Sequence, residues 1–137
     1  DEYVLATLFH QDCLVRISKK DGTSEVILNG VTNPHGIHRI ANGYIISDTR
    51  GNRALVLDQN FQIISELKGD MKWVQDAVCV GNNYIVGNDN NGRLDVFNPL
   101  SEKIREVEWG RDNRKMSVMA TVTAGDMKNV FPTLRRD

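Results

Sequence analysis

A pattern that recurs every forty residues is the feature that most limits how this chain of 137 residues can fold. The identical pairs at this offset include Asn42 and Asn82, Tyr44 and Tyr84, Ile45 and Ile85, and Arg53 and Arg93. Residues 3–7 match residues 44–48 when one extra residue is allowed in the turn that follows. Three copies in phase indicate a repeat architecture, in which each unit buries its apolar surface against the next.

Each copy reads as short β-strands separated by turns. In the most complete copy, Asn42-Gly43 is a strong signal for a two-residue hairpin turn, because both positions tolerate positive φ. The apolar runs at 44–46 and 54–57 are bounded by turn residues and suit buried strands better than helices. The same reading predicts further strands at residues 3–8, 13–18, 24–28, 36–40, 61–67, 74–80, 84–88, 94–97 and 103–109. Apolar residues nowhere recur at helical spacing over three turns, so we expect an all-β chain.

The strand count predicts a β-propeller. Four strands in about forty residues is the make-up of one propeller blade. If the strands of a blade are lettered a to d from the inside, the chain runs b-c-d, a-b-c-d, a-b-c-d and a final a-like segment at residues 116–122. Together they make about three four-stranded blades over residues 1–122, with residues 123–137 left as a degenerate strand, a cap or a tail.

Three blades are too few to close a ring, since propellers contain roughly four to eight. Two explanations remain open. Either a second copy of the chain completes a six-bladed homodimer, with blades shared across the subunit boundary, or the sequence is one part of a longer propeller. The whole number of blades favours the homodimer, which also leaves no exposed sheet edge.

Composition narrows the class of partner. The chain has 17 basic and 18 acidic residues, a net charge of −1 and no charged block, so nothing favours nucleic acid or an anionic membrane as a partner. No apolar run approaches 18 residues, the length that a membrane span requires. Cys13 and Cys79 lie in apolar strand runs outside any CxxC motif, which favours buried thiols over a disulfide or a metal pair. We therefore expect a soluble protein, and unpaired thiols favour the cytoplasm.

Residues 34–58 resemble the NHL repeat and the wider six-bladed propellers that include gluconolactonase-like proteins. The family pattern reads P-x-G-I and then G-x-h-h-V-x-D-x-x-N-x-R-h-x-h-h-D, where h is apolar. The matching residues here are Pro34, Gly36, Ile37, Gly43, Asp48, Asn52, Arg53 and Asp58. The second copy keeps Arg93 and Asn98 but replaces the Pro-x-Gly start with residues 73–76. The resemblance implies the propeller fold and leaves the function open, because one fold hosts many functions.

His35, Gln75 and Asp76 stand where the inner strands of their blades begin, so we expect their side chains to reach the central channel. In the amidating lyases of this architecture a similar Pro-His-Gly segment supplies a zinc-binding histidine, and gluconolactonase-like propellers hold a divalent ion at the channel. The resemblance thus makes His35 and Asp76 the candidate ligands of a divalent cation. Zinc needs three or four ligands, however, and the equivalent later positions hold Gln75 and Lys115. A polar residue at the channel mouth is therefore the favoured reading of His35, and no cofactor is expected beyond that candidate cation.

Trp73, Asn88 and Asp89 complete the predicted ligand-binding set. An exposed tryptophan can stack on a sugar or a base, although packing in the core or at an interface also explains Trp73. Asn88 and Asp89 belong to an oxygen-rich segment that is too short for an EF-hand loop and lacks its closing glutamate. Asp48 has a structural explanation, because it matches the aspartate that ties a repeat turn to backbone amides. Hydrogen bonding within the blade explains His38.

The sequence favours a binding module that is not an enzyme. This module would be a half-ring that assembles with itself and holds a small molecule, glycan or peptide at the channel or on one face. The reason is a regular repeat in which no Ser-His-Asp set, phosphate loop or pair of catalytic carboxylates is identifiable. The alternative is a divalent-metal-dependent hydrolase or lyase of the gluconolactonase-like or amidating type, in which His35 and Asp76 bind the metal.

Overall fold

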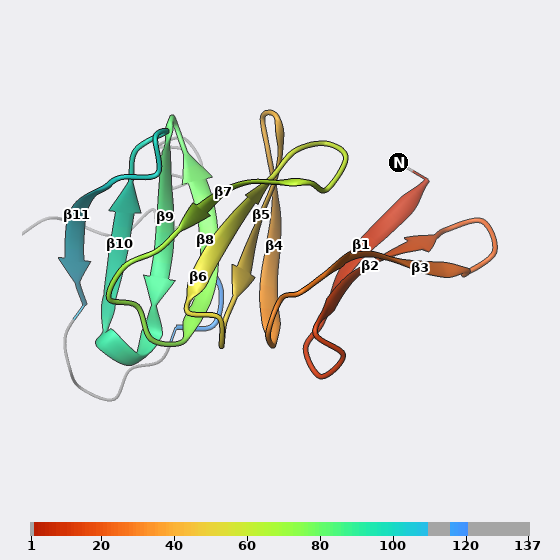
Figure 1. Ribbon diagram of the computed structural model, residues 1–137, viewed down its shortest axis with the longest axis horizontal. Coiled ribbons are helices and arrows are strands. Elements are labelled where there is room, and N and C mark those ends of the chain that lie inside the picture. The colour runs from red at the N-terminus through yellow and green to blue at the C-terminus, as the bar shows by residue number, and fades with distance from the viewer. Residues whose placement is uncertain (1, 110–115, 121–137) are drawn as a thin grey trace, which may run out of the picture.

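The computed structural model describes residues 2–109 and 116–120, and in it three antiparallel sheets lie side by side (Figure 1). The first sheet contains β1 (Tyr3–Leu8), β2 (Cys13–Ser18) and β3 (Ser24–Asn29). The second contains β4 (Pro34–Ile40), β5 (Gly43–Asp48), β6 (Arg53–Leu57) and β7 (Ile63–Leu67). The third contains β8 (Val74–Val80), β9 (Asn83–Asn88), β10 (Arg93–Phe97) and β11 (Lys103–Glu108). A 3-10 turn, η1 (Asp89–Asn91), joins β9 to β10.

Every strand pairs with its neighbour in the sequence, which is the up-and-down order of propeller blades. We call the three sheets blade 1, blade 2 and blade 3. The all-β prediction and the division into blades of three, four and four strands are confirmed. The strand predicted at residues 116–122 is wrong for its described part, because residues 116–120 form no strand. Residues 121 and 122, like the predicted cap or tail at 123–137, lie outside the described residues.

A left-handed turn explains why β7 begins later than predicted. The sequence placed its start at Phe61, whereas the strand runs from Ile63. Phe61 has φ 62° and donates its backbone N–H to the carbonyl of Asp58 at 3.2 Å, which closes a tight turn ahead of the strand. The apolar side chain of Phe61 had suggested a strand residue, but it belongs to the turn.

The apolar core is divided between the two interfaces of the three blades. Between blades 1 and 2 lie the buried residues Leu14, Val31, Ile46, Leu55 and Leu57. Between blades 2 and 3 lie Ile45, Ala54, Val56, Leu67, Met71, Val74, Ala77, Val86 and Phe97. Successive side chains of a strand point to opposite faces, so Ile45 and Ile46 enter different clusters. Blade 2 is therefore covered on both faces, which is why its strands are unbroken apolar runs.

The turns between the blades repeat with a period of forty. Asp12 accepts a hydrogen bond from the backbone N–H of Asn33 at 2.7 Å, and Asn52 accepts one from the N–H of Trp73 at 2.9 Å. Both acceptors have left-handed backbones, with φ of 54° and 52°. Asp12 lies in the turn between β1 and β2, and Asn52 in the turn between β5 and β6. Each bond ties this turn of one blade to the start of the next blade, so it fixes how neighbouring blades are spaced.

The structure corrects the alignment that allowed an extra residue after residues 3–7. Leu8 pairs with Cys13 in blade 1, and Asp48 pairs with Arg53 in blade 2, again forty residues on. Residues 3–7 therefore match residues 43–47 rather than 44–48. The correction matters because a shift of one residue exchanges the two faces of a strand.

Asp48 has the structural role that the repeat pattern predicted. The carboxylate is fully buried and accepts hydrogen bonds from the backbone N–H of Thr32 at 2.6 Å and from Nε of Arg53 at 2.7 Å. A carboxylate bonded in this way links the end of β5 to the loop that enters blade 2. Asp48 is thus accounted for by the fold.

Both cysteines are free thiols. Cys13 is buried, as predicted, whereas Cys79 is only partly buried and donates to the carbonyl of Gly81 at 3.5 Å. Burial raises the pKa of the Cys79 thiol, which keeps it in the less reactive protonated form.

The described residues include no helix with the length and apolar character that crossing a membrane requires.

Candidate functional site

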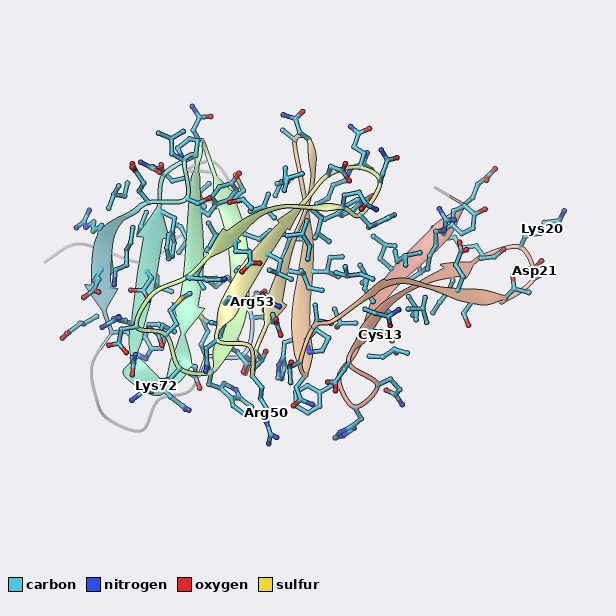
Figure 2. The ribbon with its side chains drawn as sticks, viewed as in Figure 1. Cys13, Lys20, Asp21, Arg50, Arg53 and Lys72 are labelled. Carbon is cyan, nitrogen blue, oxygen red and sulfur yellow. The ribbon has the colours of Figure 1, made fainter. Side chains whose placement is uncertain are left out.

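One cavity of about 340 Å³ brings together three of the residues predicted at the channel, His35, Gln75 and Asp76. It lies where β4 and β8 begin, beside the edge of the blades from which Arg50 and Lys72 project (Figure 2). The remaining lining residues are Thr7, Phe9, Pro34, Gly36, Ser117 and Val118. The walls therefore come from all three blades and from the segment 116–120.

The segment 116–120 is held against the start of blade 3 by two carboxylates. Asp89 accepts a hydrogen bond from the backbone N–H of Met116 at 2.8 Å, and Asp76 accepts one from the N–H of Met119 at 2.7 Å. These bonds place Ser117 on the cavity wall. The offset of forty had suggested Lys115 for this place, but Lys115 lies outside the described residues, and Ser117 is the residue that the structure brings there.

Hydrogen bonding fixes the tautomer of His35. Nδ1 of its imidazole lies 2.7 Å from Oγ1 of Thr49, and this hydroxyl donates its one proton to the carbonyl of Val74 at 2.7 Å. Thr49 can then only accept from the imidazole, so Nδ1 carries the hydrogen. Nε2 of a neutral His35 is consequently an acceptor, and no described residue bonds to it. The cavity thus contains a basic nitrogen that is available to a ligand.

Aromatic side chains flank this imidazole. The rings of Phe9 and His35 meet edge to face, with centroids 4.8 Å apart and planes inclined by 72°. The Trp73 ring lies at 6.0 Å on a tilted plane and donates its Nε1–H to Oε1 of Gln75 at 2.8 Å. Nε2 of Gln75 in turn donates to the carbonyl of Ser117 at 3.4 Å. Trp73 therefore lies behind the cavity wall and orients Gln75, rather than lining the cavity itself.

Asp76 lines the cavity, yet its carboxylate is already engaged. It is only 1% exposed, and Oδ1 accepts from the backbone N–H of Ala77 at 2.9 Å and lies 2.8 Å from Nε2 of His38. Oδ2 accepts from Met119. Three partners from two blades and the segment 116–120 leave one lone-pair direction of Oδ2 unused. This arrangement joins the inner strands β4 and β8. His38 is hydrogen-bonded, as expected, but its partner belongs to blade 3 rather than to its own blade.

The described residues do not fit a divalent metal centre. No group of three or more His, Cys, Asp or Glu side chains in the described ranges is placed to hold an ion. His35 offers one nitrogen, and Asp76 is bonded to His38 and to two backbone amides. A catalytic zinc ion needs three protein ligands, and calcium takes six or more oxygen atoms. Metal chemistry at this cavity would need ligands from other parts of a ring.

Asn88 and Asp89, the remaining predicted ligand-binding residues, do not line the cavity. Asn88 is fully buried, accepts from the backbone N–H of Lys72 at 2.9 Å, and donates to the carbonyl of Asp70 at 2.9 Å. It therefore occupies the place in blade 3 that Asp48 has in blade 2. The bond of Asp89 to Met116 gives it a part in holding one wall.

Sequence reasoning missed Thr49, Phe9 and Ser117. Thr49 and Phe9 follow β5 and β1 directly, at the end of the strands where β4 and β8 begin. Their position forty residues apart was the available signal, because equivalent positions of neighbouring blades face the same end of a propeller. The offset of forty gives Lys115 as the equivalent position, and Ser117 stands two residues after it, so the repeat did not identify Ser117.

A scan against protein-family models and a search of curated proteins both find no match to this sequence. Solved structures do share its fold. A streptogramin B lyase superimposes with a TM-score of 0.72 at 10% identity, over 86% of this chain and 41% of the lyase. A periplasmic gluconolactonase from Pseudomonas aeruginosa gives a TM-score of 0.62 at 15% identity, over 80% and 37% of the two chains.

A third similar structure is a nidogen/laminin complex, with a TM-score of 0.67 at 12% identity over 85% of this chain and 46% of the other. The chain therefore spans less than half the length of each of these three structures. At such low identities the likeness concerns architecture and nothing finer. Together with the three sheets and their order, it establishes that the described residues are three neighbouring blades of a β-propeller fold.

Proposed function

We propose that this chain is a binding module, and that the cavity around His35 holds a small hydroxyl-bearing molecule such as a sugar. The observation that carries the proposal is Nε2 of His35, to which no described residue bonds. It is an acceptor because Thr49 holds the ring hydrogen on Nδ1. An acceptor in a partly buried cavity favours a ligand that brings a donor, and a hydroxyl group is a neutral donor that can fill this role.

The shape and lining of the cavity support this ligand class. Its volume of about 340 Å³ lies at the small end of ligand cavities, which span roughly 300–1,000 Å³. Phe9 and Pro34 supply apolar wall, and the amide of Gln75 and the hydroxyl of Ser117 supply polar groups. A few polar groups on an apolar wall are what orients a small ligand.

The similar structures are compatible with more than one use of this fold. Two carry the names of enzymes, a streptogramin B lyase and a gluconolactonase, and one is part of a nidogen/laminin complex. We favour binding because the Asp76 carboxylate beside His35 is already bonded to His38 and to two backbone amides. In addition, no group of three possible metal ligands is found among the described residues. The metal-dependent hydrolase or lyase stays the alternative hypothesis.

We also propose that two copies of the chain assemble into the ring. The face of blade 1 that points away from blade 2 carries Val4 and Val26, which are 46% and 52% exposed. Val4 corresponds to Tyr44 in blade 2, on the face that also carries Ile46 and Leu57, and blade 1 buries that face. The outer face of blade 1 therefore has the apolar character of a surface that another blade covers.

Replacing His35 with alanine is expected to weaken the binding of a neutral monosaccharide or disaccharide about tenfold or more, the usual effect of leaving a ligand group without its hydrogen bond. The measurement is a titration of the labelled chain followed by amide NMR shifts, with a panel of neutral sugars as probes. Shifts are expected for the amides of Gly36, Gln75 and Ser117, which surround the cavity.

His10→Ala is the matched control, since this exposed histidine touches only the edge of the Phe9 ring and does not line the cavity. It should leave the titration unchanged. The proposed function is rejected if no sugar in the panel shifts the cavity amides, or if His10→Ala weakens binding as much as His35→Ala does.

Assembly predicts a particle of twice the chain mass of 15.4 kDa in sedimentation or light scattering at micromolar concentration. Val26→Glu should convert it to the monomer, because a carboxylate buried in an apolar interface without a partner costs several kcal/mol. Lys20→Gln, which changes the charge by the same single unit at the exposed tip of the β2–β3 hairpin, should leave the dimer intact (Figure 2). A native chain that sediments as a monomer would overturn the assembly.

A further inference from the structure

A second cavity, of about 320 Å³, is lined by residues of blades 1 and 2, among them Arg39, which lies at the opposite end of β4 from His35. We call it the arginine groove. Blade 1 lines it with Tyr3 and Arg16, and blade 2 lines it with Arg39, Tyr44 and Phe61. None of these side chains belongs to the proposed sugar site.

The repeat provides an internal comparison for this groove. The matching cavity between blades 2 and 3 is lined by Val56, Cys79 and Tyr84. These residues stand forty positions after Arg16, Arg39 and Tyr44. The register agrees, since Arg39 pairs directly with Tyr44 and Cys79 pairs directly with Tyr84. Of these three positions, only the tyrosine is the same in both grooves. The two arginines are therefore not needed to form a groove between blades.

Phe61 is a further addition. It adopts φ 62°, and Ser101, at the same place in the turn of blade 3, adopts φ 64°. Each residue donates its N–H to the carbonyl three residues earlier, so the turn itself works with a small side chain. A bulky residue in the left-handed region is strained and uncommon. Here the large ring stacks on Tyr44, with centroids 4.9 Å apart and planes at 17°, which gives the groove a flat aromatic wall.

The two arginines differ in what they contact. Arg16 is bonded through Nε to Oε1 of Glu25 at 2.6 Å and lies over the Tyr3 ring at 4.8 Å. Arg39 is exposed, and its side chain makes no hydrogen bond or ion pair with any residue in the described ranges. Glu2 also lines the groove, but it forms no ion pair with either arginine. The guanidinium of Arg39 is thus the cation that a ligand can engage.

We propose that the arginine groove binds an aromatic carboxylate. The flat part of the ligand would lie against the Tyr44 and Phe61 rings, and its carboxylate would accept hydrogen bonds from the guanidinium of Arg39. Arginine suits this task because its planar fork matches a carboxylate with two parallel bonds. The site is separate from the sugar site, so either can fail without the other.

The test is an NMR titration of the full chain with two probes that share one ring, indole-3-acetate and tryptamine. Indole-3-acetate is expected to shift the amides around Arg39, Tyr44 and Phe61 with a dissociation constant below about 1 mM, whereas the cationic tryptamine should bind at least about tenfold more weakly. Arg39→Gln should weaken indole-3-acetate about tenfold. Glu2→Gln should strengthen it, because a like charge is removed from the groove.

Arg105→Gln is the matched control, as Arg105 is an exposed arginine on β11 that does not line the groove. It should leave the affinity unchanged. Phe61→Ser installs the residue that blade 3 uses in the same turn, so the fold should persist while binding weakens. Equal binding of the two probes, tighter binding of tryptamine, or an Arg39→Gln chain that binds like the native one would each overturn the proposal.

Discussion

Asp76→Ala is expected to lower the free energy of unfolding by about 3 kcal/mol, because it removes a buried acceptor from three donors at once. The carboxylate is 1% exposed and bonds to His38, to the backbone of Ala77 and to the backbone of Met119. A buried N–H that loses its acceptor costs roughly 1–3 kcal/mol, while the half-exposed His38 can turn to water. Urea unfolding followed by tryptophan fluorescence gives the loss directly.

The same substitution should release the segment 116–120. Only the bond between Asp76 and Met119 and the bond between Asp89 and Met116 tie the backbone amides of this segment to carboxylates of blade 3 in the described ranges. Hydrogen exchange at the Met119 amide should accelerate by at least about tenfold, since it reports local opening. Because the segment carries Ser117, sugar binding at the cavity should weaken as well.

Asp21→Ala is the control, because Asp21 lies at the tip of an exposed hairpin, where its carboxylate accepts hydrogen bonds from Thr23 (Figure 2). Its loss should cost less than about 1 kcal/mol. Asp76→Asn tests the charge separately: its amide can accept from Ala77 but presents N–H groups to another donor, so it should recover only part of the loss. An Asp76→Ala chain as stable as Asp21→Ala would show that the three bonds do not act together.

The sequence was most informative wherever one blade suffices to explain a residue. The strands, their order and the role of Asp48 all follow from a local pattern that is repeated. His35, Gln75 and Asp76 could be grouped because equivalent positions of a repeat face the same end of the propeller. This grouping follows from the forty-residue period of the repeat alone and needs no knowledge of which side chains contact one another.

Several of the features that the sequence did not reveal are interactions between blades. Whether His38 bonds to Asp76 depends on how two sheets are spaced, which no pattern within one sheet encodes. The shift of one residue in blade 1 arose because Tyr3 resembles Tyr44, although Leu5 and Ile45 are the residues that face the next blade. Side-chain identity is thus a weaker guide to register than the face a residue buries.

The buried carboxylate that pairs with the arginine of the repeat stands on different strands in blades 2 and 3. In blade 2, Asp48 accepts hydrogen bonds from the backbone N–H of Thr32 in the loop and from Arg53. Leu55, two residues after Arg53 on β6, belongs to the apolar core between blades 1 and 2. In chemical terms one buried carboxylate both caps the loop and neutralises the arginine. Arg53 also donates to the carbonyl of Gly30 at 3.2 Å, which fixes the loop from its other end.

Blade 3 divides the same work between two residues. Asn88 accepts from the loop N–H of Lys72, while Asp95, at the position of Leu55, accepts from Nε of Arg93 at 3.0 Å. Nδ2 of Asn88 donates to Oδ2 of Asp95 at 2.8 Å, so the amide and the carboxylate are joined. Asn88 and Asp95 are both fully buried. The pair is thus an alternative solution to the same structural requirement.

Asn88→Asp alone should therefore destabilise the chain by about 3–5 kcal/mol, because it places two buried carboxylates within 2.8 Å of each other. The loss should shrink as the pH falls. Repulsion raises the pKa of one carboxyl in the folded state, so protonation favours the folded chain at low pH and that stabilisation disappears as the pH rises.

Adding Asp95→Leu to Asn88→Asp should recover most of that stability, since the two changes together rebuild the arrangement of blade 2, with Arg93 free to pair with the new carboxylate. Asp95→Leu alone should cost about 1–3 kcal/mol, because Arg93 loses its buried partner but keeps Glu106 at 3.3 Å. The double-mutant cycle, measured by urea unfolding at neutral pH, should give a favourable coupling of at least about 2 kcal/mol. If the two losses are instead additive, a carboxylate at position 88 cannot replace the one at position 95. Blades 2 and 3 would then not use interchangeable arrangements.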